Sequence, residues 1–179
     1  PELFIVDLPA DEQSWKRAGE APLAGTSTTM PSPPAGVQQR RLTFTHQRRY
    51  PGLVNVPRHW VRSNPRGSDI AFLMRDEAGV VQLWLIAAEG GEPRQLTHNA
   101  TDIQSAFNWH PSGAALGFVL ENRIALCDSA MGTIVFLTDT HPEHQPSADA
   151  VVFSPDGKKI AWMADVAGFR QLWMADTGL

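Results

Sequence analysis

The sequence has 179 residues, of which 42% are hydrophobic and 19% charged, and its formal net charge is −4. This balance is typical of a globular domain with a buried core and argues against a disordered chain. All apolar runs are shorter than the about 20 residues that a membrane-spanning helix needs, so we expect no membrane span.

The first predicted strands are separated by a long irregular segment. Residues 3–8 are an apolar run that predicts a strand, and residues 40–43 predict its partner. Between them, residues 9–39 are rich in proline, glycine, serine and threonine, which indicates an irregular insertion. We therefore interpret residues 1–45 as the second half of a four-stranded unit.

The rest of the chain contains a repeat. Pro65, Pro111 and Pro155 are each followed two residues later by glycine, and they are spaced by 46 and 44 residues. Pro-x-Gly between apolar runs is typical of a turn between two strands. The second predicted strands are residues 70–74, 116–120 and 160–163; the third are residues 81–86, 123–127 and 171–174; the fourth end in Leu96-Thr97 and Leu137-Thr138.

Four short strands in every 40–50 residues are the pattern of a β-propeller blade. The predicted fold is thus all-β, a single partial propeller domain over residues 1–179 with four-stranded antiparallel blades. The predicted blades are residues 53–97, 101–138 and 147–179. The last one lacks its outer strand, and an unpaired strand edge is normally avoided. We expect a strand from a missing N-terminal half to complete the ring.

Two segments carry a resemblance to a known family. Residues 153–162, with Ser154-Pro155-Asp156-Gly157, and residues 90–97 resemble the aspartate-containing WD-like propeller repeat of TolB-like proteins. The opening segments, residues 1–6 and 40–52, are similar to the C-terminal half of an uncharacterised enterobacterial propeller family with no established activity. The middle repeat departs from the pattern, because Ser112 stands where aspartate is usual.

The same repeat also occurs in enzymes. Oligogalacturonate lyases resemble this chain in the repeat and use a propeller-borne metal with basic residues to cleave acidic sugars. Propeller domains of prolyl-oligopeptidase-type enzymes share it too, but the Gly-x-Ser-x-Gly nucleophile motif of their peptidase half is absent from this sequence.

Histidines are concentrated in the loops expected at one face of the propeller. These loops are residues 46–57, 98–102 and 139–147, and five of the six histidines lie in or just after them. Converging imidazoles would bind a divalent metal; the alternative is that polar loops simply contain histidine, since no pair has a diagnostic metal-binding spacing. The candidate metal ligands are His46, His98, His141 and His144, with oxygen from Gln104, Gln145 or Asp149.

Arginines form the second chemical signal. Seven arginines and no acidic residue lie between Arg40 and Arg66. Guanidinium groups bind carboxylates and phosphates in a bidentate manner, so an anionic ligand is a reasonable expectation. The alternative is that four of the arginines lie along strands or turns and pair with acidic residues of adjoining blades: Arg40, Arg41, Arg62 and Arg66. The candidate ligand-binding residues are Arg48, Arg49, Arg58, His59, Gln104 and Asp149.

His59 beside Arg58 would suit proton abstraction next to a bound carboxylate, and the alternative is a structural histidine at a strand start. Trp60, Trp84, Trp109, Trp162 and Trp173 lie in the predicted strands and are interpreted as core between blades. The negative overall charge disfavours nucleic acid. The lone Cys127 leaves the compartment open, with a slight preference for the cytoplasm.

No residue set in the sequence is typical of a catalytic site. The leading hypothesis is a noncatalytic binding module whose basic, histidine-rich face meets a protein partner or an anionic small molecule or oligosaccharide. The alternative is a metal-dependent lyase acting on acidic oligosaccharides, with the metal near the propeller channel.

Overall fold

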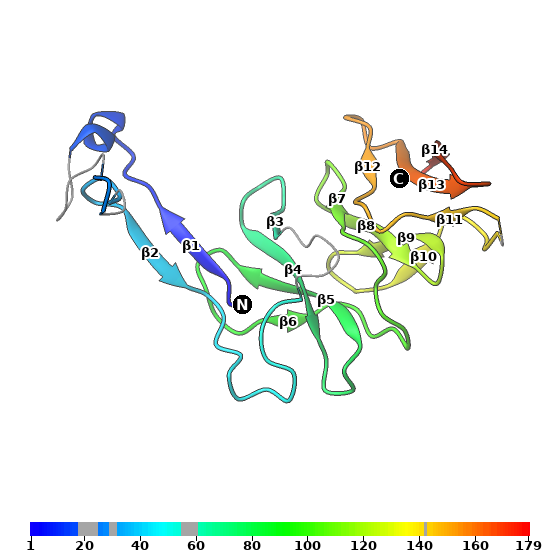
Figure 1. The fold of residues 1–179 in the computed structure, drawn as a ribbon, viewed down its shortest axis with the longest axis horizontal. Coiled ribbons are helices and arrows are strands. Elements are labelled where there is room, and N and C mark those ends of the chain that lie inside the picture. The colour runs from blue at the N-terminus through cyan, green and yellow to red at the C-terminus, as the bar shows by residue number, and fades with distance from the viewer. Residues whose placement is uncertain (18–24, 29–31, 55–60, 142) are drawn as a thin grey trace. The chain divides into compact units, whose positions relative to one another are not determined.

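A computed structural model describes residues 1–17, 25–28, 32–54, 61–141 and 143–179. The chain divides into two compact units, residues 2–44 and residues 45–179 together with Pro1. Apart from one short 3-10 helix, the regular elements of the described residues are antiparallel strands (Figure 1). The predicted all-β class with four-stranded antiparallel sheets is therefore confirmed, and no sheet formed by these described strands closes on itself. No helix in this described part is both long and apolar enough to cross a bilayer.

The smaller unit is a two-stranded ribbon. Strands β1 (Phe4–Asp7) and β2 (Gln38–Arg41) pair antiparallel, and the 3-10 helix η1 (Glu12–Lys16) lies in the segment between them. Ion pairs join Arg40 to Asp7 at 2.6 Å and Arg41 to Glu2 at 2.8 Å. Two of the clustered arginines thus have acidic partners within this ribbon.

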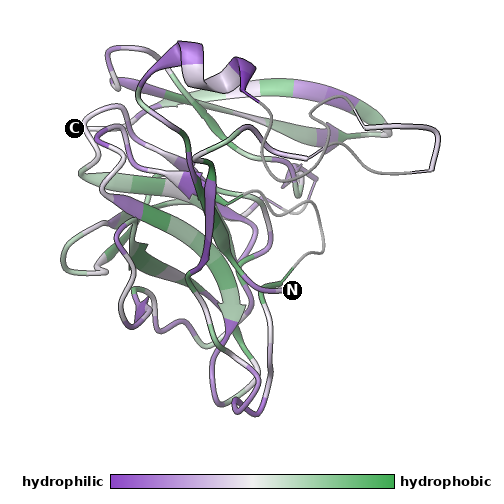
Figure 2. Ribbon diagram, turned by 90° about the vertical axis from the view of Figure 1, so that its left-hand side faces the viewer, coloured by the Kyte–Doolittle hydropathy of each residue, from purple (hydrophilic) through white to green (hydrophobic). Residues whose placement is uncertain are grey.

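The first two sheets of the larger unit are simple meanders (Figure 1). The first has the order β3 (Arg62–Ser63), β4 (Asp69–Arg75), β5 (Val81–Ala87) and β6 (Arg94–Gln95). The second has the order β7 (Asn108–Trp109), β8 (Ala115–Leu120), β9 (Arg123–Asp128) and β10 (Ile134–Phe136). Their central strands β4, β5, β8 and β9 are almost completely buried, and Figure 2 shows apolar residues gathered on the strands and hydrophilic ones in the turns.

The third sheet is built differently. Strands β11 (Gln145–Pro146) and β12 (Val152–Phe153) both pair with the same edge of β13 (Lys159–Val166), and β14 (Phe169–Asp176) pairs with the other edge. This sheet therefore has three strand positions side by side. Within the described residues no strand lies beyond β14, and the outer strand expected from a missing N-terminal half stays a prediction.

The Leu-Thr pairs have a role that differs slightly from the predicted one. Strand β6 ends at Gln95, just before Leu96 and Thr97. Beyond this point the Leu96 N–H and the Thr97 hydroxyl form the hydrogen bonds to strand β5. Leu96 donates its N–H to the carbonyl of Leu83 at 2.8 Å, and the Thr97 hydroxyl accepts the N–H of Leu83 at 2.9 Å. The same two bonds join Leu137 and Thr138 to Ile124, and Leu42 and Thr43 to Leu3. The first two strands of the chain thus have the pairing of the third and fourth strands of the larger sheets.

The Pro-x-Gly segments form equivalent turns. In each, the glycine N–H bonds to the residue before proline, and the φ angles of Gly67, Gly113 and Gly157 are +73°, +77° and +74°. Turns of neighbouring sheets meet, since a Cβ on Gly113 would lie 3.5 Å from Pro65 Cδ. At the next junction, Gly157 lies directly against the buried ring of His110.

Two apolar clusters join the three sheets. One contains Leu83, Phe107 and Leu116, and the other contains Val151 and Ile160. Trp84 and Trp109 are buried, as predicted, whereas Trp162 and Trp173 are only partly buried and Trp60 lies outside the described residues. The sheets are packed so closely that a Cβ on Gly117 of β8 would lie 2.8 Å from Ile160 and from Phe153.

Candidate functional site

The meander topology gives the larger unit two distinct ends. The turns after the first and third strands of each sheet, such as residues 64–68 and 110–114, lie at one end, which we call the turn end. The turns after the second strands and the connections between sheets, such as residues 76–80 and 139–149, lie at the other, which we call the loop end. The sequence predicted binding residues at the loop end.

The arginines predicted at the loop end have structural partners. Arg48 donates to the carbonyl of Arg75 at 3.1 Å, lies 3.4 Å from a carboxylate oxygen of Glu77 and stacks over Trp84 at 4.7 Å. Arg49 lies over the ring of Tyr50 at 5.4 Å. Arg48, which the sequence predicts to bind a ligand, is therefore held by contacts within the chain. Arg58 and His59 lie outside the described residues.

Gln104 and Asp149 each have interaction partners other than the predicted arginines. The Gln104 side-chain oxygen accepts the N–H of Asn122 at 2.7 Å and so supports the turn between β8 and β9. Asp149 accepts from the Ser147 hydroxyl at 3.2 Å and lies 3.8 Å from Arg170. Among the described residues, no hydrogen bond or ion pair joins either of them to Arg48 or Arg49.

The structure brings together two of the four predicted metal ligands. The rings of His141 and His144 stack at 3.9 Å, whereas His98 contacts the side chain of Gln95 at 3.1 Å and His46 is exposed. In the described part of the chain, no group of three or more His, Cys, Asp or Glu side chains is placed to hold a metal ion. The metal site stays a prediction.

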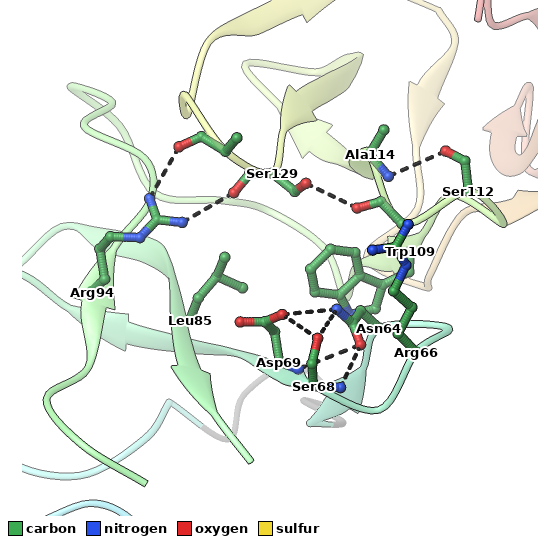
Figure 3. Close-up of a pocket in the computed structure, with 12 residues that line it drawn as sticks. Asn64, Arg66, Ser68, Asp69, Leu85, Arg94, Trp109, Ser112, Ala114 and Ser129 are labelled. Carbon is green, nitrogen blue, oxygen red and sulfur yellow. Dashed lines mark hydrogen bonds between the residues drawn. The ribbon is translucent and has the colours of Figure 1, made fainter. Parts of the chain in front are cut away.

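A pocket at the turn end lies between the first and second sheets. It has a volume of about 420 Å³ (Figure 3). Arg94 lies on one side and donates to the carbonyls of Ser129 at 3.1 Å and Ala130 at 3.4 Å. Arg66 also lines the pocket, across from Arg94. Two guanidinium groups from different strand ends thus flank one cavity.

One carboxylate lies between these arginines and is held by neutral groups. Asp69 accepts from the Asn64 amide at 2.9 Å and from the Ser68 hydroxyl at 2.7 Å, as Figure 3 shows. No ion pair joins Asp69 to Arg66 or Arg94 among the described residues. With two cations and one anion, the pocket lining carries a net positive charge.

Sequence reasoning did not find this site. From the sequence, Arg66 is one of the arginines of residues 40–66 for which structural pairing is the alternative, and Arg94 stands out only as part of the repeat segment 90–97. The usable signal was that both lie next to turn residues, Arg66 inside Pro65-Arg66-Gly67 and Arg94 after Pro93. Their common pocket forms only because two sheets pack side by side.

Comparisons with known proteins agree with this fold. No protein-family profile matches the sequence. The chain is 68% identical over 177 residues, 99% of its length, to the uncharacterised protein YidR of Escherichia coli, and it spans only 41% of that protein. The predicted resemblance to an uncharacterised propeller protein is confirmed.

Solved structures with a similar fold include TolB and a lyase. A putative TolB from Agrobacterium tumefaciens matches with a TM-score of 0.59 and 22% identity, covering 84% of this chain and 50% of that one. An oligogalacturonate lyase from Vibrio parahaemolyticus matches with a TM-score of 0.54 and 14% identity, covering 92% of this chain and 36% of that one. At such identities the similarity shows the fold alone, which is that of TolB-like β-propellers.

Proposed function

We propose that this chain is part of a noncatalytic binding module whose turn-end pocket holds an anionic group of a small molecule or of a protein partner. The observation that carries the proposal is the presence of Arg66 and Arg94 on two sides of one cavity of about 420 Å³. This volume falls within the roughly 300–1,000 Å³ of small-molecule sites.

The hydrogen bonding of Arg94 supports an anion site. Its guanidinium group has about five N–H donors, and two bonds to the carbonyls of Ser129 and Ala130 fix its position. The remaining donors are available to a carboxylate or phosphate, whose paired oxygens match the fork of N–H groups. The neutral donors of Asn64 and Ser68 are already used on Asp69, so the arginines would supply the affinity.

This proposal places the anion site at the turn end and not at the predicted loop end. At the loop end, Arg48 is already engaged with Glu77 and Trp84. Two histidines of the loop end, His141 and His144, line a different cleft. The predicted basic, histidine-rich face therefore does not form one binding site. The arginines of the proposed anion site and these two histidines line separate pockets.

The lyase alternative needs a set of metal ligands and a base. No observation on the described residues favours it, because the similarity to the Vibrio lyase concerns the fold. An ultraviolet assay for unsaturated uronide, run on the full-length protein with manganese or calcium, tests it directly. Formation of product would refute the noncatalytic module.

The anion site is tested by calorimetric titration of the full-length protein with citrate, inorganic phosphate and digalacturonate. Charge-assisted hydrogen bonds contribute about 1.5–3 kcal/mol each, so Arg66→Gln and Arg94→Gln should each weaken binding by roughly tenfold or more. Arg170→Gln, an arginine paired with Asp149 and Asp165 at the loop end, is the matched control and should bind normally. Equal binding by all three variants, or no binding of any probe, would remove the proposal.

A further inference from the structure

We infer that a second cleft, between the second and third sheets and open toward the loop end, binds a small organic cation such as a quaternary ammonium or alkylated amine. The cleft has a volume of about 230 Å³. It differs from the turn-end pocket in position and in the sign of its charge, so it goes beyond the proposed function. Its lining includes Asn122, Asp139, His141, His144, Trp162 and Trp173.

Aromatic rings form a continuous wall of this cleft. Trp162 of β13 and Trp173 of β14 are direct partners in the strand register, so their side chains share one face of the third sheet. His144 packs on Trp173 with ring centroids 4.7 Å apart, and His141 stacks on His144 at 3.9 Å. The faces of aromatic rings are electron-rich and attract cations, and tryptophan does so most strongly.

The charge of the cleft has the sign that a cation requires. Among the described residues, Asp139 is the only acidic residue of the lining, and no lysine or arginine lines the cleft. Asp139 is exposed and has no ion pair among the described residues. The described part of the lining therefore places one carboxylate, without an ion-pair partner, beside two tryptophans.

The size of the cleft limits the ligand. The volume is below the roughly 300–1,000 Å³ of drug-sized sites, which favours a ligand as small as an amino alcohol.

The test titrates the full-length protein with choline and tetramethylammonium and follows calorimetry and tryptophan fluorescence. The neutral isostere 3,3-dimethyl-1-butanol, which keeps the shape and hydroxyl of choline but lacks its charge, is titrated in parallel. We expect choline to bind about tenfold more tightly than the isostere. Equal binding of the two, or no binding of either cation, would overturn the inference.

Two substitutions and one control locate the site. Trp173→Leu should weaken choline binding by about tenfold. Asp139→Asn should weaken it by about three- to fivefold, because an ion pair with an exposed carboxylate contributes up to about 1 kcal/mol. Glu143→Gln removes a charge from the same loop at a residue that does not line the cleft, and it should leave binding within about twofold, because exposed charges outside a site contribute little. Asp139 is exposed, so its substitution tests the site even if Trp173→Leu fails to fold. Unchanged choline affinity in Asp139→Asn would refute the assignment.

Discussion

Replacing Gly157 with alanine tests whether neighbouring sheets meet at their Pro-x-Gly turns. A Cβ at this position would lie 2.1 Å from Nε2 of His110, which is itself buried and donates to the Gly157 carbonyl at 3.1 Å. Gly67 is the matched control, because it has the same place in its turn and a φ of +73° against +74°, yet nothing lies within 4 Å of its Cβ.

The expected difference follows from these contacts. A left-handed backbone costs an L-residue about 1–2 kcal/mol, and this cost applies to both positions. Only at Gly157 must the His110 ring also move and lose its buried hydrogen bond, which adds about 1–3 kcal/mol. Gly67→Ala should therefore lower the free energy of unfolding by about 1–2 kcal/mol and Gly157→Ala by about 2–5 kcal/mol.

Equilibrium urea unfolding, followed by tryptophan fluorescence and circular dichroism, measures these values. In a His110→Ala background the alanine at position 157 has no ring to displace, so its cost should fall to that of Gly67→Ala. Equal destabilisation by Gly157→Ala and Gly67→Ala in the unmodified protein would refute the packing of turn against turn.

Two further predictions concern ionisable groups in the larger unit. Burial opposes ionisation of Asp76, but hydrogen bonds from Gln82 and from the N–H groups of Val80, Ala78 and Gly79 outweigh it and lower the pKa below 3.8. This stabilisation is present above the unfolded pKa of about 3.9 and is lost as pH falls through the folded value. Asp76 accepts from Gln82 with one carboxylate oxygen and from the N–H groups of Ala78 and Val80 with the other. Asp76→Asn replaces one of these two acceptors with an NH₂ donor that faces another N–H donor, so it should cost about 1–3 kcal/mol at pH 7. Urea unfolding near pH 3 should show a smaller difference. Burial raises the pKa of Cys127 to about 12, so at pH 8 the thiol should react with a disulfide reagent only after unfolding; rapid modification of the native protein would contradict its buried placement.

The strands and turns were predictable from the sequence because their causes are local. A proline that presets φ and a glycine that accepts a positive φ specify the turns at residues 65–67, 111–113 and 155–157 wherever they occur. The Leu-Thr pairs correctly located the fourth strands, but only the tertiary structure showed that they follow these strands and form hydrogen bonds to the third. Strand β6 ends before Leu96 because the Thr97 hydroxyl takes over a backbone hydrogen bond.

The sites depended on the packing of separate sheets. Arg66 and Arg94 line one pocket only because the turn ends of the first two sheets lie side by side. The stack of His141 and His144 reaches Trp173 only because the third sheet presents that ring to the connecting loop. Conversely, Arg48 looked available in the sequence and is held by Glu77 and Trp84, about 30 residues away. Apolar periodicity and turn chemistry act over a few residues, so the sequence by itself determined the repeating strands. Contacts between repeats join residues that are tens of positions apart, so only the tertiary structure decided them.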